Sequence, residues 1–166
     1  LLANTSGSAL LIAQELLWKE QRIQFKYTFY PSNYADLNPE LLGKNTIQQM
    51  VKDYNAQTIW FSGNLYAFLP KSKIPKWMNI AIGYGVNGMT NGSLNDQIET
   101  IDGCCIDNPR TSQFYLSLDV DLRRIKTGSV FFNKALKVLS FIKIPSPAFM
   151  FDKEKIITFY PFYYGQ

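Results

Sequence analysis

The alternation of hydrophobic and polar residues predicts a chain built mainly from β-strands. Hydrophobic side chains recur at every second position of the segment 22–30: Ile23, Phe25, Tyr27 and Phe29. In the segment 79–89, large side chains alternate with Ala81, Gly83 and Gly85, which indicates that the second face of this strand meets crowded space. Further strands are expected over 57–69, with a bend at Gly63 and Asn64, and as a hairpin formed by 148–151 and 155–160. We therefore expect about six strands.

The segment 111–123 carries the longest alternation. One side is apolar: Phe114, Leu116, Leu118, Val120 and Leu122. The other side is polar: Tyr115, Ser117, Asp119 and Asp121. At about 3.3 Å per residue, the segment would extend roughly 40 Å, enough to cross the hydrocarbon core of a membrane at a tilt. We predict that the apolar side faces lipid or an apolar neighbour and that the polar side stays wet.

Helical patterns occur in three places. They cover 9–18, a segment near 46–55 with Thr46 and Gln49 as a capping box, and 129–143 with Ser129 as the N-cap. The segment 31–43 is expected to be a loop. In the third helix, lysines form the polar side of an amphipathic pattern, which is typical of a helix lying at a membrane interface.

These elements predict one domain over 1–166, with an N-terminal helix in 1–20 and antiparallel strands in 22–164. The fold class is β-rich with helices, either a meander-like antiparallel sheet or a small outer-membrane β-barrel with amphipathic interfacial helices. Closed barrels of that kind need about eight strands or more, so another segment or subunit would have to complete the sheet. The alternative is a soluble α+β domain.

Composition and charge favour contact with a membrane or a partner. The chain is 46% hydrophobic and only 18% charged, with a formal net charge of +4. Six basic residues and no acid fall within 123–143: Arg123, Arg124, Lys126, Lys134, Lys137 and Lys143. Four acids without a basic residue fall within 87–109: Asp96, Glu99, Asp102 and Asp107. We expect the basic segment to contact anionic lipid or an acidic subunit and not nucleic acid, because its aromatic residues do not interleave with the cations.

Candidate catalytic chemistry is sparse, and we predict no catalytic residue, no cofactor and no metal site. The chain has no histidine, the commonest general base. Asp119 and Asp121 could form an acid and base pair, but the favoured interpretation is that they line a polar interior and pair with basic residues. Oxygen donors in 91–107 match no EF-hand spacing, which favours a solvated acidic loop. Cys104 and Cys105 are neighbours and are interpreted as a structural or incidental pair.

The start of the chain and its apolar runs bear on its origin. It begins at Leu1 without the pattern of a signal peptide, and we interpret it as a processed or truncated piece. It contains no apolar run of about 18 residues that would form a conventional transmembrane helix.

Several stretches resemble the uncharacterised YfiM-like family of predicted envelope lipoproteins, in the long form found in Bacteroidota. They are LLANTSGSALLIAQELLWKEQRIQFKYTFYPSNYA, KDYNAQTIWFS, IPKWMNIAIGYGVNGM, YLSLDVDLRRIKTGS and LSFIKIPSPAF. The resemblance implies a periplasmic or outer-membrane location in a Gram-negative bacterium. It implies no catalytic residue in this chain, and the upstream family region that contains His and Asp has no counterpart here.

The resulting hypothesis is a non-enzymatic protein associated with the outer membrane, an accessory or structural subunit of a larger envelope complex. Its expected partners are membrane lipid and other proteins. Two alternatives stay open. One is a lipid-acting enzyme of the outer membrane whose polar strand face lines a pocket, and the other is a soluble periplasmic binding module.

Overall fold

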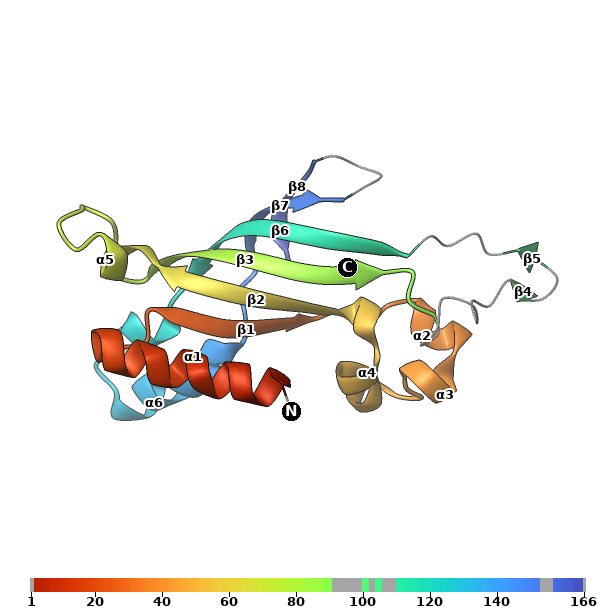
Figure 1. Ribbon diagram of the computed structural model, residues 1–166, viewed down its shortest axis with the longest axis horizontal. Helices are drawn as coiled ribbons and strands as arrows, with labels where there is room; N and C mark the ends of the chain where they lie inside the picture. The colour runs from red at the N-terminus through yellow and green to blue at the C-terminus, as the bar shows by residue number, and fades with distance from the viewer. Residues whose placement is uncertain (1, 91–99, 102–103, 106–109, 153–156, 166) are drawn as a thin grey trace.

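Six strands form one antiparallel sheet, and they are arranged in the sheet in the same order as along the chain. The computed structural model describes residues 2–90, 100–101, 104–105, 110–152 and 157–165. The strand order is β1-β2-β3-β6-β7-β8 (Figure 1). The strands are β1 (Ile23–Phe29), β2 (Gln57–Asn64), β3 (Met78–Asn87), β6 (Thr111–Val120), β7 (Ser146–Phe151) and β8 (Thr158–Tyr163). Two short strands, β4 (Thr100–Ile101) and β5 (Cys104–Cys105), pair separately.

This architecture confirms the predicted β-rich class with helices and the meander-like order of the sheet. An α+β description fits it equally well. The barrel, which was the second form of the predicted fold class, is not formed, because within the described ranges the edge strands β1 and β8 do not pair and the sheet stays open.

Helices gather near the two ends of β1. Near one end lie α1 (Leu2–Trp18) and α6 (Val130–Val138), and near the other lie α2 (Tyr34–Leu37), α3 (Pro39–Leu42) and α4 (Thr46–Lys52) (Figure 1). Shorter helical turns follow several strands and helices: η1 (Tyr54–Ala56), α5 (Leu65–Phe68), η3 (Leu122–Arg124) and η4 (Leu139–Phe141). None of the helices in the described part of the chain combines the length and apolar character needed to cross a membrane.

Local polar side chains explain where the structure departs from the sequence predictions. The segment predicted as a loop contains α2 and α3, and the Asn38 side chain accepts a hydrogen bond from Leu41 N at the start of α3. Helix α4 is capped by Asn45, which accepts from Gln48 N, and not by the expected box at Thr46. Strand β6 ends at Val120, earlier than predicted, because the Asp121 carboxylate caps η3.

The sheet presents an apolar outer face. A single cross-strand row runs through all six strands: Phe25, Phe61, Ile82, Leu116, Phe149 and Phe159. Every side chain in this row is exposed. The neighbouring inward row contains Lys26, Trp60 and Tyr115, all buried, and the buried side chains of the described residues are more often polar than hydrophobic. Polarity is therefore inverted relative to an ordinary water-soluble sheet.

The sheet curls strongly around its inner face. Tyr163 in β8 hydrogen-bonds through its hydroxyl to Thr58 Oγ1 in β2 at 2.8 Å, although four strand spacings of about 4.8 Å separate these strands along the sheet. At the edge of β1, Lys143 N donates to Tyr27 O at 3.1 Å, and β7 begins only three residues later. The edges also approach where the rings of Tyr30 and Tyr164 lie 5.3 Å apart.

An aromatic cluster packs in the interior of the curled sheet. The ring centroids of Trp60, Tyr115 and Tyr163 lie 4.7 to 5.6 Å apart, in tilted and edge-to-face geometry. Opposite the indole of Trp60 stands Gly83, where an added Cβ would lie 2.6 Å from Trp60 Cε3. The expectation that this face of β3 meets crowded space is confirmed.

We expect Gly83→Ala to lower the free energy of unfolding by about 1 to 3 kcal/mol, because the methyl group overlaps the Trp60 ring. Gly63→Ala is the matched strand control, since its Cβ would meet atoms only at 3.8 Å, and a change under about 1 kcal/mol is expected. Denaturant titration monitored by tryptophan fluorescence measures both. Equal stability of the two variants would contradict this packing argument.

Candidate functional site

The polar side of β6 points into the interior of the curled sheet. The predicted polar residues Tyr115, Ser117, Asp119 and Asp121 are each at most 4% exposed. They come from alternate positions of one strand and its end, and the other strands and the segment before β7 enclose them. The interpretation that Asp119 and Asp121 line a polar interior and pair with basic residues is confirmed, whereas the prediction that this side stays wet is wrong.

A buried ion pair crosses this interior. Lys26 Nζ in β1 lies 2.7 Å from Asp119 Oδ2 in β6, and both side chains are fully buried. Lys26 Nζ also donates to Val120 O at 2.7 Å, and Ser62 Oγ donates to the same carboxylate oxygen of Asp119. The other oxygen, Asp119 Oδ1, has no hydrogen-bond partner among the described atoms. The Asp119 carboxylate in β6 thus balances the charge of Lys26 in β1, three strands away in the sheet.

Side-chain amides extend the network toward one end of the sheet. Asn79 Nδ2 donates to Ser62 Oγ at 2.8 Å, and Asn64 Nδ2 donates to Asn79 Oδ1 at 2.7 Å. The Asn64 side chain also donates to Lys76 O, and it accepts from Ala67 N as the N-cap of α5. These contacts link strands β2 and β3 with helix α5, and Ser62 joins them to Asp119 in β6, so the ion pair is embedded in a connected polar network.

A second buried cation, Lys143, lies beside the first pair. Its Nζ donates to Ser146 Oγ at 2.7 Å and Ser117 Oγ at 2.9 Å, and it lies 4.5 Å from the centroid of the Trp60 ring. Desolvation lowers the pKa of Lys143 to about 8, with the nearby Asp119 opposing this and Lys26 adding to it. Lys143 was expected at the membrane interface. It is buried because it follows the end of η4, on the segment that runs along the edge of β1.

The Ser117 and Lys143 contact has the composition of a nucleophile and a base, a pairing that some hydrolases use. Access argues against that role here, because the Ser117 side chain is buried and its hydroxyl is engaged by Ser146 and by backbone carbonyls. Burial also raises the pKa values of Tyr115 and Tyr163, which keeps both phenols neutral. The arrangement is suited to holding the strands together.

Asp121 serves a different cluster at the end of β6. Its carboxylate receives Arg123 Nε at 3.1 Å and lies 3.5 Å from Arg124 Nε. Arg124 also contacts Glu20 just after α1, at 3.1 Å. The other predicted interfacial lysines, Lys126, Lys134 and Lys137, are exposed on α6 and the loop before it.

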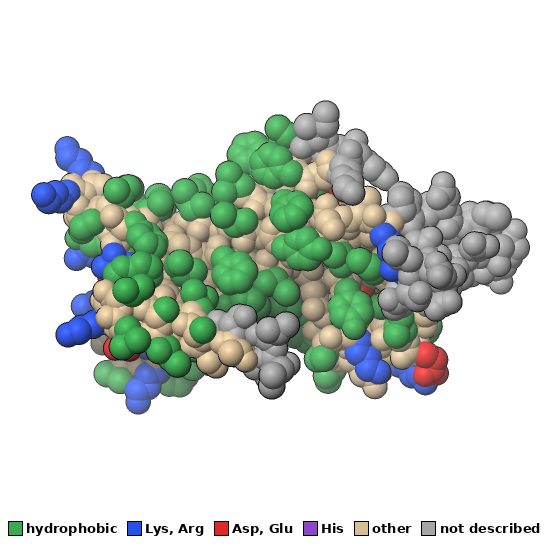
Figure 2. Space-filling view, viewed as in Figure 1, with side chains coloured by type: hydrophobic (Ala, Val, Ile, Leu, Met, Phe, Trp, Pro, Cys, Tyr) green, Lys and Arg blue, Asp and Glu red, His purple; other side chains and the backbone are tan. Residues whose placement is uncertain are grey.

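The residues predicted to face lipid lie on the outer face of the sheet, with one exception. Phe114, Leu116 and Leu118 are 53, 42 and 47% exposed, and Val120 is half-buried. Leu122 is buried, because it belongs to η3 and not to the strand. Hydrophobic side chains spread over the middle of the face seen in Figure 2, and many of the visible Lys and Arg side chains lie toward its left-hand end.

Sequence reasoning missed Lys26 and Lys143 as interior cations. A usable signal existed for Lys26, since it alternates with hydrophobic residues on the same inward side as Gln24 and Thr28. No comparable signal marked Lys143. The acids of the segment 87–109 (Asp96, Glu99, Asp102 and Asp107) lie outside the described residues, as do the side chains of Cys104 and Cys105. Within the described ranges, no three His, Cys, Asp or Glu side chains gather where they could hold a metal ion.

Comparison with known proteins gives one partial similarity. The chain is 31% identical over 99 residues to a protein named Peptidase B from Photorhabdus laumondii subsp. laumondii. The match covers 54% of this chain but only 22% of that protein, so the chain spans about a fifth of its relative's length. No protein-family model matches the chain, and no solved structure is significantly similar to it.

We expect Asp119→Asn to lower the free energy of unfolding by about 3 to 5 kcal/mol, because it leaves Lys26 buried without a counter-charge. The double variant Lys26→Met with Asp119→Leu should recover most of this loss. Glu40→Gln is the control, since its contact with Lys44 is exposed and its loss should cost under about 1 kcal/mol. Denaturant titration provides the comparison, and a mild effect of Asp119→Asn would contradict the assigned role.

The depressed pKa of Lys143 predicts a pH-dependent stability. Between about pH 8 and 10 the unfolded chain holds a proton on this lysine that the folded chain releases, so stability should rise with pH by about 2 kcal/mol. Above pH 10 the raised tyrosine pKa values reverse the trend, because the unfolded phenols ionise first. Unfolding free energies across this range should lose the rise in Lys143→Met. A rise that persists in this variant would exclude Lys143 as its source.

Proposed function

We propose that this protein is associated with the outer membrane of a Gram-negative cell envelope, with the outer face of its sheet against lipid. It acts without catalysis, as an accessory or structural subunit of a larger envelope complex. The main observation in support of this proposal is the exposed apolar row that runs from Phe25 in β1 to Phe159 in β8. Outward apolar and inward polar side chains are the alternation expected of strands that border lipid.

The dimensions of the apolar face support contact with lipid. Outward side chains along β3 run from Met78 to Val86, which at about 3.3 Å per residue spans roughly 26 Å. The lipid-facing band of outer-membrane proteins is about 25 Å tall. Six strands spaced about 4.8 Å apart make this face roughly 24 Å wide. A patch of this size exceeds what water-soluble monomers ordinarily expose.

The amphipathic helix α6 supports a position at the membrane surface. Its exposed side chains include Val130, Phe131 and Phe132 together with Lys134 and Lys137. Apolar side chains beside lysines favour the boundary between acyl chains and anionic headgroups.

The sheet edges support the role of a subunit. Part of the β1 edge is covered within the chain, because Gln14 exchanges two hydrogen bonds with the backbone of Ile23 and Lys143 N donates to Tyr27 O. Lipid offers no partner to backbone groups at an open edge. Completion of the sheet by another segment or another subunit would satisfy the remaining groups.

Three alternative functions receive less support from the structure and the comparisons. A lipid-acting enzyme would need the polar face of β6 to be accessible, and Ser117 and Asp119 are buried. A periplasmic binding module is favoured only by an apolar groove beside β1, which is equally compatible with a membrane protein. A peptidase activity rests solely on the name of a relative that the chain covers by about a fifth. The resemblance to YfiM-like lipoproteins favours the envelope location.

We expect Ile82→Lys to abolish flotation of the protein with phosphatidylcholine and phosphatidylglycerol vesicles while leaving it folded. Ile82 is 60% exposed at the centre of the row, and a lysine near the bilayer midplane costs about 2 to 4 kcal/mol. Ile47→Lys is the matched control, because Ile47 is 78% exposed on α4, away from the row. Carbonate extraction of native membranes provides the second measurement. Recovery of the wild-type protein entirely in the soluble fraction would overturn the proposal.

A further inference from the structure

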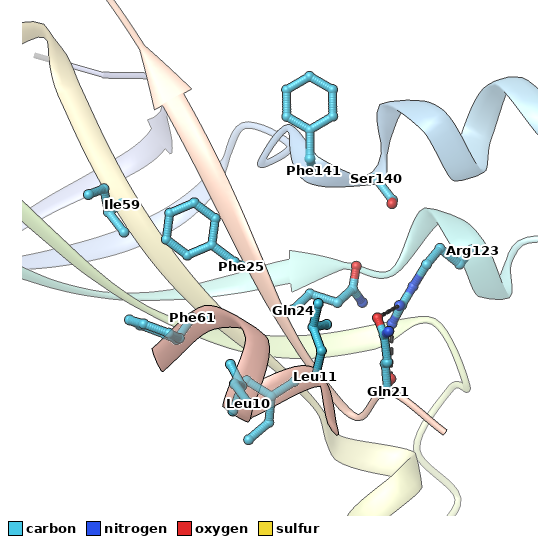
Figure 3. A pocket seen from close by; sticks show the side chains of 12 residues that line it. Leu10, Leu11, Gln21, Gln24, Phe25, Ile59, Phe61, Arg123, Ser140 and Phe141 are labelled. Carbon is cyan, nitrogen blue, oxygen red and sulfur yellow. Dashed lines mark hydrogen bonds between the residues drawn. The ribbon is translucent and has the colours of Figure 1, made fainter. Parts of the chain in front are cut away.

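A groove of about 820 Å³ lies beside β1, between α1, β2 and η4. Its apolar walls include Leu10, Leu11, Phe25, Phe61 and Phe141, and Gln24 and Arg123 supply polar groups (Figure 3). Sites for small ligands commonly have volumes of about 300 to 1,000 Å³ and combine apolar walls with a few polar groups. The groove therefore has the size and lining of a ligand site.

Gln24 carries an unused donor in this groove. Its side chain is only 6% exposed, and its Nε2 is buried with no hydrogen-bond partner among the described atoms. In Figure 3 the amide of Gln24 reaches toward the side of the groove where Ser140 and Arg123 lie. Buried side-chain donors nearly always have a partner, so this position calls for an acceptor oxygen from a ligand.

The edge of β1 leaves one further position open in the groove. Arg22 O accepts from Asn64 N and Tyr30 N donates to Ala56 O, so the backbone N–H and C=O groups of the even-numbered residues of β1 point toward β2. The backbone groups of the odd-numbered residues point toward the free edge of the strand, where Gln14 binds Ile23 and Lys143 N binds Tyr27 O. The backbone groups of Phe25 lie between these two contacts. A single open position is too short for an added peptide strand and suits a small polar group.

The charge at the polar end favours an anionic headgroup. Three arginines (Arg22, Arg123 and Arg124) meet only two carboxylates (Glu20 and Asp121), an excess of one positive charge. Arginine side chains suit phosphate because their donors form a fixed fork. The apolar walls run from this end toward the exposed outer face of β2.

We propose that the groove binds an anionic glycerophospholipid, with one acyl chain against the apolar walls and the phosphate beside the arginine cluster. An ester oxygen at the top of the acyl chain accepts the hydrogen bond from Gln24 Nε2. This inference rests on the proposed membrane location for the source of the ligand, because the surrounding bilayer would supply it.

Photo-crosslinking tests the proposal. The probes are diazirine-labelled phosphatidylglycerol in phosphatidylcholine vesicles, and short-chain dioctanoyl phosphatidylglycerol with the same label, which needs no bilayer. Gly7→Phe places a ring in the groove, and an added Cβ at Gly7 meets nothing within 4 Å. Gly128→Phe is the matched control, because its Cβ is equally unobstructed and Gly128 lies outside the groove. Gln24→Leu removes the donor while keeping the side-chain size.

We expect label on peptides that contain Leu10 and Phe141, reduced about tenfold by Gly7→Phe and by Gln24→Leu and unchanged in Gly128→Phe. Equal labelling in Gly7→Phe and the wild type would overturn the site. If unlabelled palmitate displaced the diazirine probe as effectively as unlabelled phosphatidylglycerol does, the assignment of a glycerophospholipid would be overturned in favour of a free fatty acid. Equal labelling by a phosphatidylcholine probe would overturn the anionic preference. Loss of a dimer in Gly7→Phe, without labelling of any variant, would assign the groove to a second copy of the chain.

The two probes separate this inference from the proposed function. Labelling of the groove by the dioctanoyl probe, without vesicle flotation, would retain the lipid site and overturn the membrane location. Flotation without labelling by either probe would overturn the site and leave the membrane location standing.

Discussion

The pairing of Lys26 with Asp119 is the constraint on which the architecture depends. The two charges come from strands that are three positions apart in the sheet, yet their side chains lie in direct contact and exclude water. Burying an unpaired charge is far more costly than any single hydrophobic contact can offset, so the folded chain must keep the two strands within reach. Curvature of the sheet follows from that requirement. The apolar side chains on the opposite face then have only the outside of the curve to occupy.

The interior of the curled sheet is consequently polar and its outer face apolar, the reverse of an ordinary water-soluble sheet. The interior holds Lys26, Lys143, Asp119 and Asp121 together with side-chain amides and a cluster of tyrosine and tryptophan, while phenylalanine, leucine and isoleucine cover the outer face of the sheet. Most of the buried polar groups named above find their hydrogen-bond partners within the folded chain, whereas the outer face of the sheet offers few polar side chains to water. The covered part of the β1 edge and the groove beside it have the same structural origin. Both lie where the curved sheet meets helix α1 and the segment before β7.

Much of the sheet could be predicted from the sequence because alternation reports directly which side chains share a face. The six strands and the crowding around Gly83 follow from patterns within single segments, but the strand expected over 57–69 ends at Asn64 and is followed by helix α5. The partner of Asp119 could not be predicted, because alternation does not tell which strands face one another across a curve. Lys143 was misplaced for a related reason: the helical pattern continues to it, although the helix ends earlier and the chain turns inward. The helices within 34–42 depend on side-chain caps too local to create a periodic signal.

The register of the six-strand row has a consequence for how the chain reaches its native pairing. Successive residues point to opposite faces, so a slip of one position would replace Phe25 by Lys26 and Leu116 by Tyr115 at the outer surface. Such a slip would also place a lysine on the apolar outer face and drive phenylalanines into the interior that holds the ion pair. Each misalignment is thus penalised on both faces at once. The opposite chemistry of the two faces therefore favours the native register over any alignment shifted by one residue.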